Sequence, residues 1–84
     1  MDTQTTAEHV RTEIKVWMAR RRLNQIELAQ RLGHDQTGVS RRLSGKRTMT
    51  VDDLEAFGRA LDVPAAEFFR VRADGSEATN YRSA

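Results

Sequence analysis

The chain has 84 residues and a formal net charge of +2, and it contains no cysteine. A chain of this length buries only about 60% of the surface that its unfolded form exposes, which excludes a second core. The missing cysteines exclude a disulfide framework and a thiolate metal site. No apolar run approaches the roughly 20 residues of a membrane-spanning helix, and the polar, acidic N-terminus is unlike a signal peptide. We therefore expect a soluble, cytoplasmic protein with no membrane partner.

The charges are unevenly distributed along the chain. Residues 9–47 hold ten Lys or Arg against three Asp or Glu, a net charge of +7. Residues 1–8 carry a net charge of −2, and residues 48–84 a net charge of −3. A basic segment beside an acidic one indicates one side that faces a polyanion. A solvated charged face is the alternative.

Residues 1–6 are small and polar, and we expect them to be disordered. A helix is predicted over residues 7–22, capped by Thr5 or Thr6. Its apolar residues recur at helical spacing and form one stripe: Val10, Ile14, Trp17 and Met18. The helix ends in three arginines, Arg20 to Arg22. Cations at this position stabilise the helix dipole or contact phosphate, and both roles are compatible.

A second helix is predicted to start at Gln25. Asn24 suits its N-cap, and Glu27 completes a capping box. Gly33 ends the helix, because glycine adopts the left-handed conformation without steric cost. Its apolar residues lie on one face: Leu28, Ala29 and Leu32.

A third helix follows at once, with Asp35 as its N-cap and Val39 and Leu43 facing inward. Two helices joined by so short a turn cross steeply, so one can lie across DNA while the other enters the major groove. The outward side chains of the third helix are Thr37, Arg41 and Ser44, flanked by Gly38 and Ser40.

The remaining elements are also predicted to be helical. Thr50 and Asp53 form a capping-box pattern that opens a fourth helix, and Asp52 and Asp53 complement its dipole. Pro64 suits the first turn of a fifth helix. Inward residues are expected at Val51, Leu54, Phe57, Ala60, Leu61, Phe68, Phe69 and Val71. Residues 73–84 read as a flexible tail or linker. The expected fold is an all-α, compact five-helix bundle.

No catalytic constellation is visible in the sequence. The two histidines, His9 and His34, lie on separate elements, without H-E-x-x-H spacing or a glycine-rich phosphate loop. We therefore expect no enzyme, no metal, no cofactor and no small-molecule substrate.

The basic segment does supply what DNA binding needs. Gln25 and Gln36 each open a helix whose free N–H groups can meet phosphate. Glutamine pairs with adenine and arginine with guanine in the major groove, and the small Gly38 would allow close approach. Cations placed where the DNA backbone would pass are Arg42, Lys46 and Arg47.

Three stretches resemble the Cro/repressor-type (Xre-like) helix-turn-helix family of phage and bacterial regulators. They are RLNQIELAQRLG at residues 22–33, QTGVSR at residues 36–41 and SGKR at residues 44–47, and the match continues through residues 54–69. The resemblance implies a lambda-repressor-like DNA-binding domain over residues 7–72, with the motif at 25–44. It also implies homodimers on pseudo-palindromic double-stranded DNA operators.

By this resemblance Gln25 would contact phosphate and brace Gln36, and Ser40 would sit at the groove wall. Together with the pattern above, the expected base contacts are Gln36, Thr37, Ser40 and Arg41. The expected phosphate contacts are Gln25, Arg22, Arg42, Ser44, Lys46 and Arg47.

One position departs from the family. The residue three after Val39 is usually aliphatic, but here it is Arg42, followed by Leu43. If Leu43 takes the inward role, the helix is rotated, and the rotation decides whether Ser40 or Arg41 reaches the bases. We expect a sequence-specific transcriptional regulator, a phage-type repressor or Cro-like protein. An antitoxin that represses its own operon, or a protein-interaction module without DNA binding, is the alternative.

Overall fold

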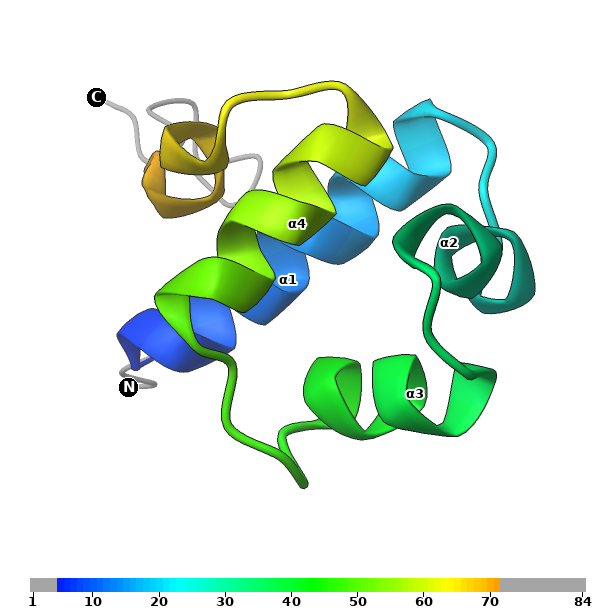
Figure 1. The fold of residues 1–84 in the computed structure, drawn as a ribbon. Helices are drawn as coiled ribbons and strands as arrows, with labels where there is room; N and C mark the ends of the chain where they lie inside the picture. Colours follow the sequence, from blue (N-terminus) through cyan, green and yellow to red (C-terminus); the bar gives the residue numbers. More distant parts are fainter. Residues whose placement is uncertain (1–4, 72–84) are drawn as a thin grey trace.

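A computed structural model describes residues 5–71 of the chain, and this part is all-helical (Figure 1). The elements are α1 (Thr6–Arg20), α2 (Gln25–Leu32), α3 (Gln36–Ser44), α4 (Val51–Leu61) and the 3₁₀ helix η1 (Ala65–Phe69). The all-α expectation is confirmed, although the fifth helix is a short 3₁₀ helix. The tail expected at residues 73–84 lies outside the described residues, as do residues 1–4. Within the described range no helix is long and apolar enough to cross a membrane.

Each α-helix begins at a side-chain cap. The N-caps are Thr5, Asn24, Asp35 and Thr50, and all but Asp35 form complete capping boxes. In the first box the Glu8 amide donates to Thr5 Oγ1 at 3.1 Å and the Thr5 amide to Glu8 Oε1 at 2.8 Å. Two orphan donors are thus satisfied at each box. The predicted caps at Asn24, Asp35 and Thr50 are confirmed.

Each α-helix also ends beside a residue in the left-handed region. These residues are Arg22 at φ 57°, Gly33 at 73°, Gly45 at 87° and Asp62 at 60°. The Leu23 amide donates to Met18 O at 2.9 Å and the Arg22 amide to Ala19 O at 3.1 Å, the hydrogen bonds of a Schellman motif. The predicted role of Gly33 is confirmed. The first helix ends at Arg20, two residues earlier than expected, because the chain turns at Arg22.

The core gathers residues from all five elements. Its buried apolar members are Val10, Ile14, Met18, Leu28, Ala29, Val39, Leu43, Leu54, Phe57, Ala60, Leu61, Val63 and Phe68. Trp17 is half-buried against them. The guanidinium carbons of Arg20 and Arg21 lie 4.8 and 5.1 Å from its ring centre.

Three residues expected in the core are exposed instead. Val51 is 72% exposed, Phe69 48% and Val71 77%. Val51 is the first residue of α4. In η1 the 3₁₀ geometry brings Phe68 inward and turns its neighbour Phe69 away.

The helices pack so that α3 lies at one edge of the molecule (Figure 1). Helix α3 packs on α2 and α1, α2 also packs on α4, and η1 covers α1 and α4. In the view of Figure 1, α3 runs along the lower edge, opposite η1. One face of α3 therefore meets the core while its other face is free to meet a partner.

Two arginines hold the C-terminal end of α4. Arg21 Nε donates to Leu61 O at 2.8 Å and its Nη2 to Asp62 O at 3.0 Å. Arg31 Nη1 donates to Ala60 O at 3.1 Å. Because the last carbonyls of a helix have no partner within it, these bonds satisfy acceptors that would otherwise need water. They join α1 and α2 to the same end of α4.

Candidate nucleic-acid interface

Helix α3 is divided into an inward and an outward face. Val39 is 0% exposed, Leu43 1% and Arg42 8%, so these three residues define the inward face. The outward face consists of five exposed residues: Gln36, Thr37, Ser40, Arg41 and Ser44. Leu43 therefore takes the inward role that the sequence left open. Leu43 and Arg42 both point inward, and Ser40 and Arg41 are both exposed.

Arg42 occupies a different environment from the one expected. Its Nε lies 3.3 Å from Asp53 Oδ2, and its Nη1 donates to Gly38 O at 3.0 Å. The buried guanidinium is thus held between α3 and the start of α4. This corrects the expectation that Arg42 projects towards the DNA backbone: the inward face of α3 accepts the charge because a carboxylate lies beside it.

Asp53 was expected to complete a capping box with Thr50 and to complement the dipole of α4, but its ion pair with Arg42 was not predicted. Burial raises the pKa of Asp53, but the hydrogen bond from the Thr50 backbone and the charge of Arg42 outweigh it and hold the pKa below its ordinary value. The Thr50 amide donates to Asp53 Oδ2 at 2.9 Å. One carboxylate therefore serves both a helix cap and an ion pair.

The N-termini of α2 and α3 carry the two glutamines expected to act together. Gln36 is exposed and Gln25 is half-buried. No hydrogen bond joins them among the described residues, so the bracing of Gln36 by Gln25 stays a prediction. At α3 the Asp35 carboxylate accepts from the Gly38 amide at 2.8 Å, which leaves other first-turn amides of that helix available to an anion.

The turn after α3 carries two exposed cations, Lys46 and Arg47. The Arg47 amide donates to Arg41 O at 3.1 Å, and Ser44 Oγ donates to the same carbonyl at 3.2 Å. These bonds fold the turn back onto the end of α3. Both cations are therefore presented beside the outward face of that helix.

Arg11 was not predicted in this region, although it belongs to the basic segment. Its guanidinium covers Gly45, and a Cβ built there would lie 3.0 Å from the guanidinium carbon. A cation at the C-terminus of α3 complements the helix dipole. Only the fold brings this residue of α1 to the end of α3, so sequence spacing held no signal for it.

The three arginines at the end of α1 have separate environments. Arg20 lies over the ring of Trp17, and Arg21 donates to the carbonyls at the end of α4. Arg22 is exposed. The two roles expected for these arginines, helix-end stabilisation and phosphate contact, thus apply to different residues. Arg21 stabilises the C-terminal end of α4, and Arg22 is available to a phosphate.

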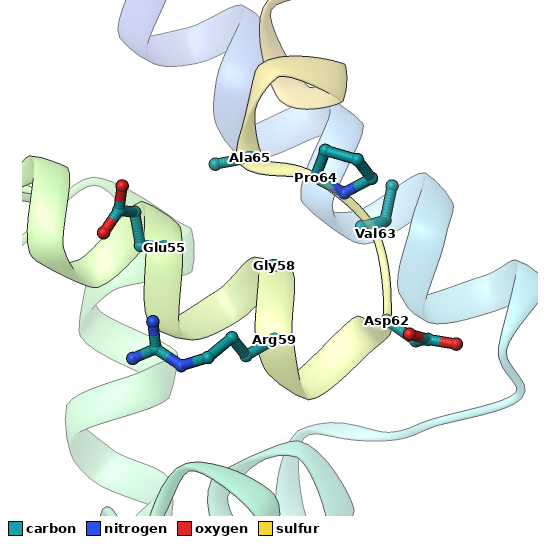
Figure 2. A pocket seen from close by; sticks show the side chains of 7 residues that line it. All are labelled: Glu55, Gly58, Arg59, Asp62, Val63, Pro64 and Ala65. Carbon is teal, nitrogen blue, oxygen red and sulfur yellow. The ribbon is translucent and has the colours of Figure 1, made fainter.

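A shallow, open depression lies elsewhere on the molecule, between α4 and the segment leading to η1 (Figure 2). The residues that line it are Glu55, Gly58, Arg59, Asp62, Val63, Pro64 and Ala65. It contains no residue of α2 or α3, so it is separate from the residues expected to meet DNA. No group of three or more potential metal-binding side chains occurs in residues 5–71.

Two short helices joined through a left-handed glycine, the second with an exposed polar face, define a helix-turn-helix protein. The family model described as Helix-turn-helix matches residues 14–68, well over half of the chain. The chain belongs to the Cro/C1-type helix-turn-helix family, a DNA-binding class of transcription regulators.

The comparison with solved structures agrees with this fold. The crystal structure of a hypothetical transcription factor, NHTF from Neisseria, is similar with a TM-score of 0.75 and 23% sequence identity. The match covers 83% of this chain and 80% of that chain. No curated protein sequence matches significantly.

Proposed function

We propose that this chain is a sequence-specific transcriptional regulator, a phage-type repressor or Cro-like protein, that reads an operator with the outward face of α3. The observation that carries the proposal is the division of α3, because its inward face is fully occupied by the core while five polar residues stand exposed. A helix with this pattern can enter the major groove without disturbing its own packing.

Within that face, we assign base reading to Gln36, Thr37, Ser40 and Arg41. Gln36 stands at the tip of the helix, where the amide side chain suits adenine, and the guanidinium of Arg41 suits guanine. The exposed positions of these side chains support the assignment.

Phosphate contacts are assigned to the residues that surround this face: Gln25, Arg22, Ser44, Lys46 and Arg47. Arg42 is omitted because its guanidinium is buried against Asp53. Contacts of this kind supply affinity and register without carrying sequence information.

The resemblance to Cro-type regulators further suggests that two copies bind a pseudo-palindromic operator, one on each half-site. In that arrangement the half-sites lie about one helical turn of DNA apart.

Selection of bound sites from random duplex DNA tests the proposal. We expect enrichment of one site with two related half-sites. A matched variant in which Gln36 and Arg41 are both replaced by Ala should keep the fold, since both side chains are exposed, and should lose the enrichment. Recovery of no enriched sequence by the native chain would favour an interaction module without DNA reading. Enrichment of a single half-site would contradict the proposed dimer but not the proposed reading of bases by α3.

A further inference from the structure

The ion pair between Arg42 and Asp53 lies beside the proposed base-reading face but has no part in the base contacts proposed above. A buried guanidinium is costly unless it is paired, and an aliphatic side chain would fill the inward position without that cost. Here Asp53 Oδ2 lies 3.3 Å from Nε, and Gly38 O accepts from Nη1 at 3.0 Å. Within residues 5–71 the Nε nitrogen has this ion pair and no hydrogen bond, while Nη1 is hydrogen-bonded, so the guanidinium is held by one contact of each kind.

Gly38 belongs to the same arrangement. A Cβ at this position would lie 3.1 Å from Arg42 Nη1 and 3.1 Å from Asp35 Oδ1. Both distances are tighter than ordinary van der Waals contact, so a side chain here would require the guanidinium and the Asp35 carboxylate to shift by a few tenths of an ångström. The absence of a side chain at residue 38 therefore makes room for Arg42 inside the protein.

Asp53 connects this arrangement to the next helix. Its Oδ2 accepts the Thr50 amide at 2.9 Å and also faces Arg42 Nε. Thr50 Oγ1 in turn accepts the Asp53 amide at 3.0 Å. Because the capping box fixes the carboxylate on α4, a rotation of α3 about its own axis would pull the guanidinium away from its partner. Apolar contacts alone are non-directional and resist such a rotation less.

We propose that Arg42 is a positioning residue for operator reading: held by Asp53 and by the Gly38 carbonyl, it fixes the rotation of α3 and so decides which side chains face the bases. The inference rests on the proposed function, since it concerns how α3 reads DNA. It assigns to Arg42 and Asp53 a part in specificity although neither touches DNA.

Asp53→Asn, with Asp52→Asn as its matched control, tests the proposal. Both substitutions remove one negative charge from the first turn of α4, but Asp52 is exposed and Asp53 faces Arg42. The measured quantity is the specificity ratio, the Kd for random duplex divided by the Kd for the selected site. We expect Asp53→Asn to lower the ratio about tenfold, the scale of one lost base contact, and Asp52→Asn to leave it unchanged. Equal ratios in the two variants would overturn the proposal.

Arg42→Leu separates positioning from phosphate contact. A positioning role predicts a lower specificity ratio with an unchanged dependence of log Kd on log salt concentration. A phosphate contact predicts that the salt slope falls by about one and that all sequences are weakened equally. The second result would overturn the proposal. Thermal unfolding is followed for each variant, and the double variant Arg42→Leu/Asp53→Asn, which leaves no unpaired buried charge, replaces Asp53→Asn if the latter fails to fold.

Hydrogen exchange of the free protein supplies a test without DNA. Asp53→Asn should accelerate exchange of the α3 amides relative to those of α1, while Asp52→Asn should not. The same rate in both variants would show that the pair does not fix α3. If site selection finds no operator, the proposed function fails, and this experiment still decides whether Arg42 positions the helix.

Discussion

Arginines in this protein have several distinct roles, and their surroundings distinguish them. Arg21 and Arg31 donate to backbone carbonyls at the end of α4, and the buried Arg42 pairs with the carboxylate of Asp53. Arg22 and Arg41 are exposed. The guanidinium of Arg42 is buried and its charge is balanced by Asp53. The charge available to DNA is therefore smaller than the composition of the basic segment indicates.

Arg22 combines an exposed cation with an unfavourable backbone conformation. Its φ of 57° lies in the left-handed region, where glycine is usual at the end of a helix and where a side chain costs about 1 kcal/mol. Arg22→Gly should therefore raise the free energy of unfolding by about 1 kcal/mol, measured in denaturant. The same variant should lower the salt slope of DNA binding by about one, if Arg22 contacts phosphate. Greater stability with an unchanged salt slope of DNA binding would show that Arg22 does not contact phosphate.

Arg41 is one of the four residues that we propose to read bases. Arg41→Ala should cost about 1–3 kcal/mol of binding free energy on the selected site and relax specificity at one position. Arg59→Ala on α4 is the matched control, because it removes the same charge from an exposed helical position. Quantitative binding to a panel of single-base variants measures both effects. Equal weakening on every sequence would show that Arg41 contacts phosphate.

The exposed residues of α3 could be predicted from the sequence because their pattern is local. Val39 and Leu43 fix the inward direction, and the helical period places Thr37 and Arg41 on the other side. The position of Arg42 could not be predicted in the same way. An arginine is ordinarily exposed, and its burial here depends on Asp53, eleven positions further along and on another helix.

At the scale of the elements, the ends of the helices are better specified than their faces. Caps and left-handed residues are short-range signals, so the starts of α2, α3 and α4 were predicted to the residue. The exposed Val51 and Phe69 were predicted wrongly, because burial at the ends of an element depends on the neighbours that cover it. The 3₁₀ form of η1 was also missed: helix type in so short a segment is decided by tertiary packing.

Among the glycines of residues 5–71, Gly58 leaves the least room for a side chain. A Cβ at this position would lie 2.6 Å from Val63 O and 3.3 Å from Ala65 N, so the segment entering η1 needs a glycine on α4 (Figure 2). Gly58→Ala should therefore destabilise the fold by about 1–3 kcal/mol, the usual cost of overpacking. Denaturant unfolding measures the change. The sign of the change in unfolding free energy distinguishes a crowded position from an open one, because replacing Gly by Ala in an open helical position stabilises the fold by up to about 1 kcal/mol.

At the scale of the whole molecule, two carboxylates link stability to pH. The hydrogen bonds from the Thr5 backbone and side chain lower the pKa of Glu8, and the pKa of Asp53 is also lowered. A carboxylate with a depressed pKa in the folded state stabilises it above the unfolded value of about 3.9 to 4.3, and loses that contribution as the pH falls further. The protein should therefore lose stability below about pH 4.5.

Asp53→Asn isolates one part of this acid dependence. At pH 7 the variant should be less stable by about 1–3 kcal/mol, because a buried cation loses its partner. Between about pH 5 and pH 2 its stability should then fall less steeply than that of the native chain. Parallel curves for the two proteins, measured by urea unfolding across this range, would exclude Asp53 as a contributor. Asp52→Asn serves as the control for the loss of charge alone.

The separation of the two faces of α3 also bears on how readily the binding preference can change. Substitutions at exposed positions away from caps usually alter stability by less than about 0.5 kcal/mol. The outward residues Gln36, Thr37, Ser40 and Arg41 can therefore be randomised together in a library while the inward residues keep the fold. Ser44 is kept, because its hydroxyl donates to Arg41 O at the end of the helix. New operator sequences would be reachable by changing a few codons, with no compensating repair in the core.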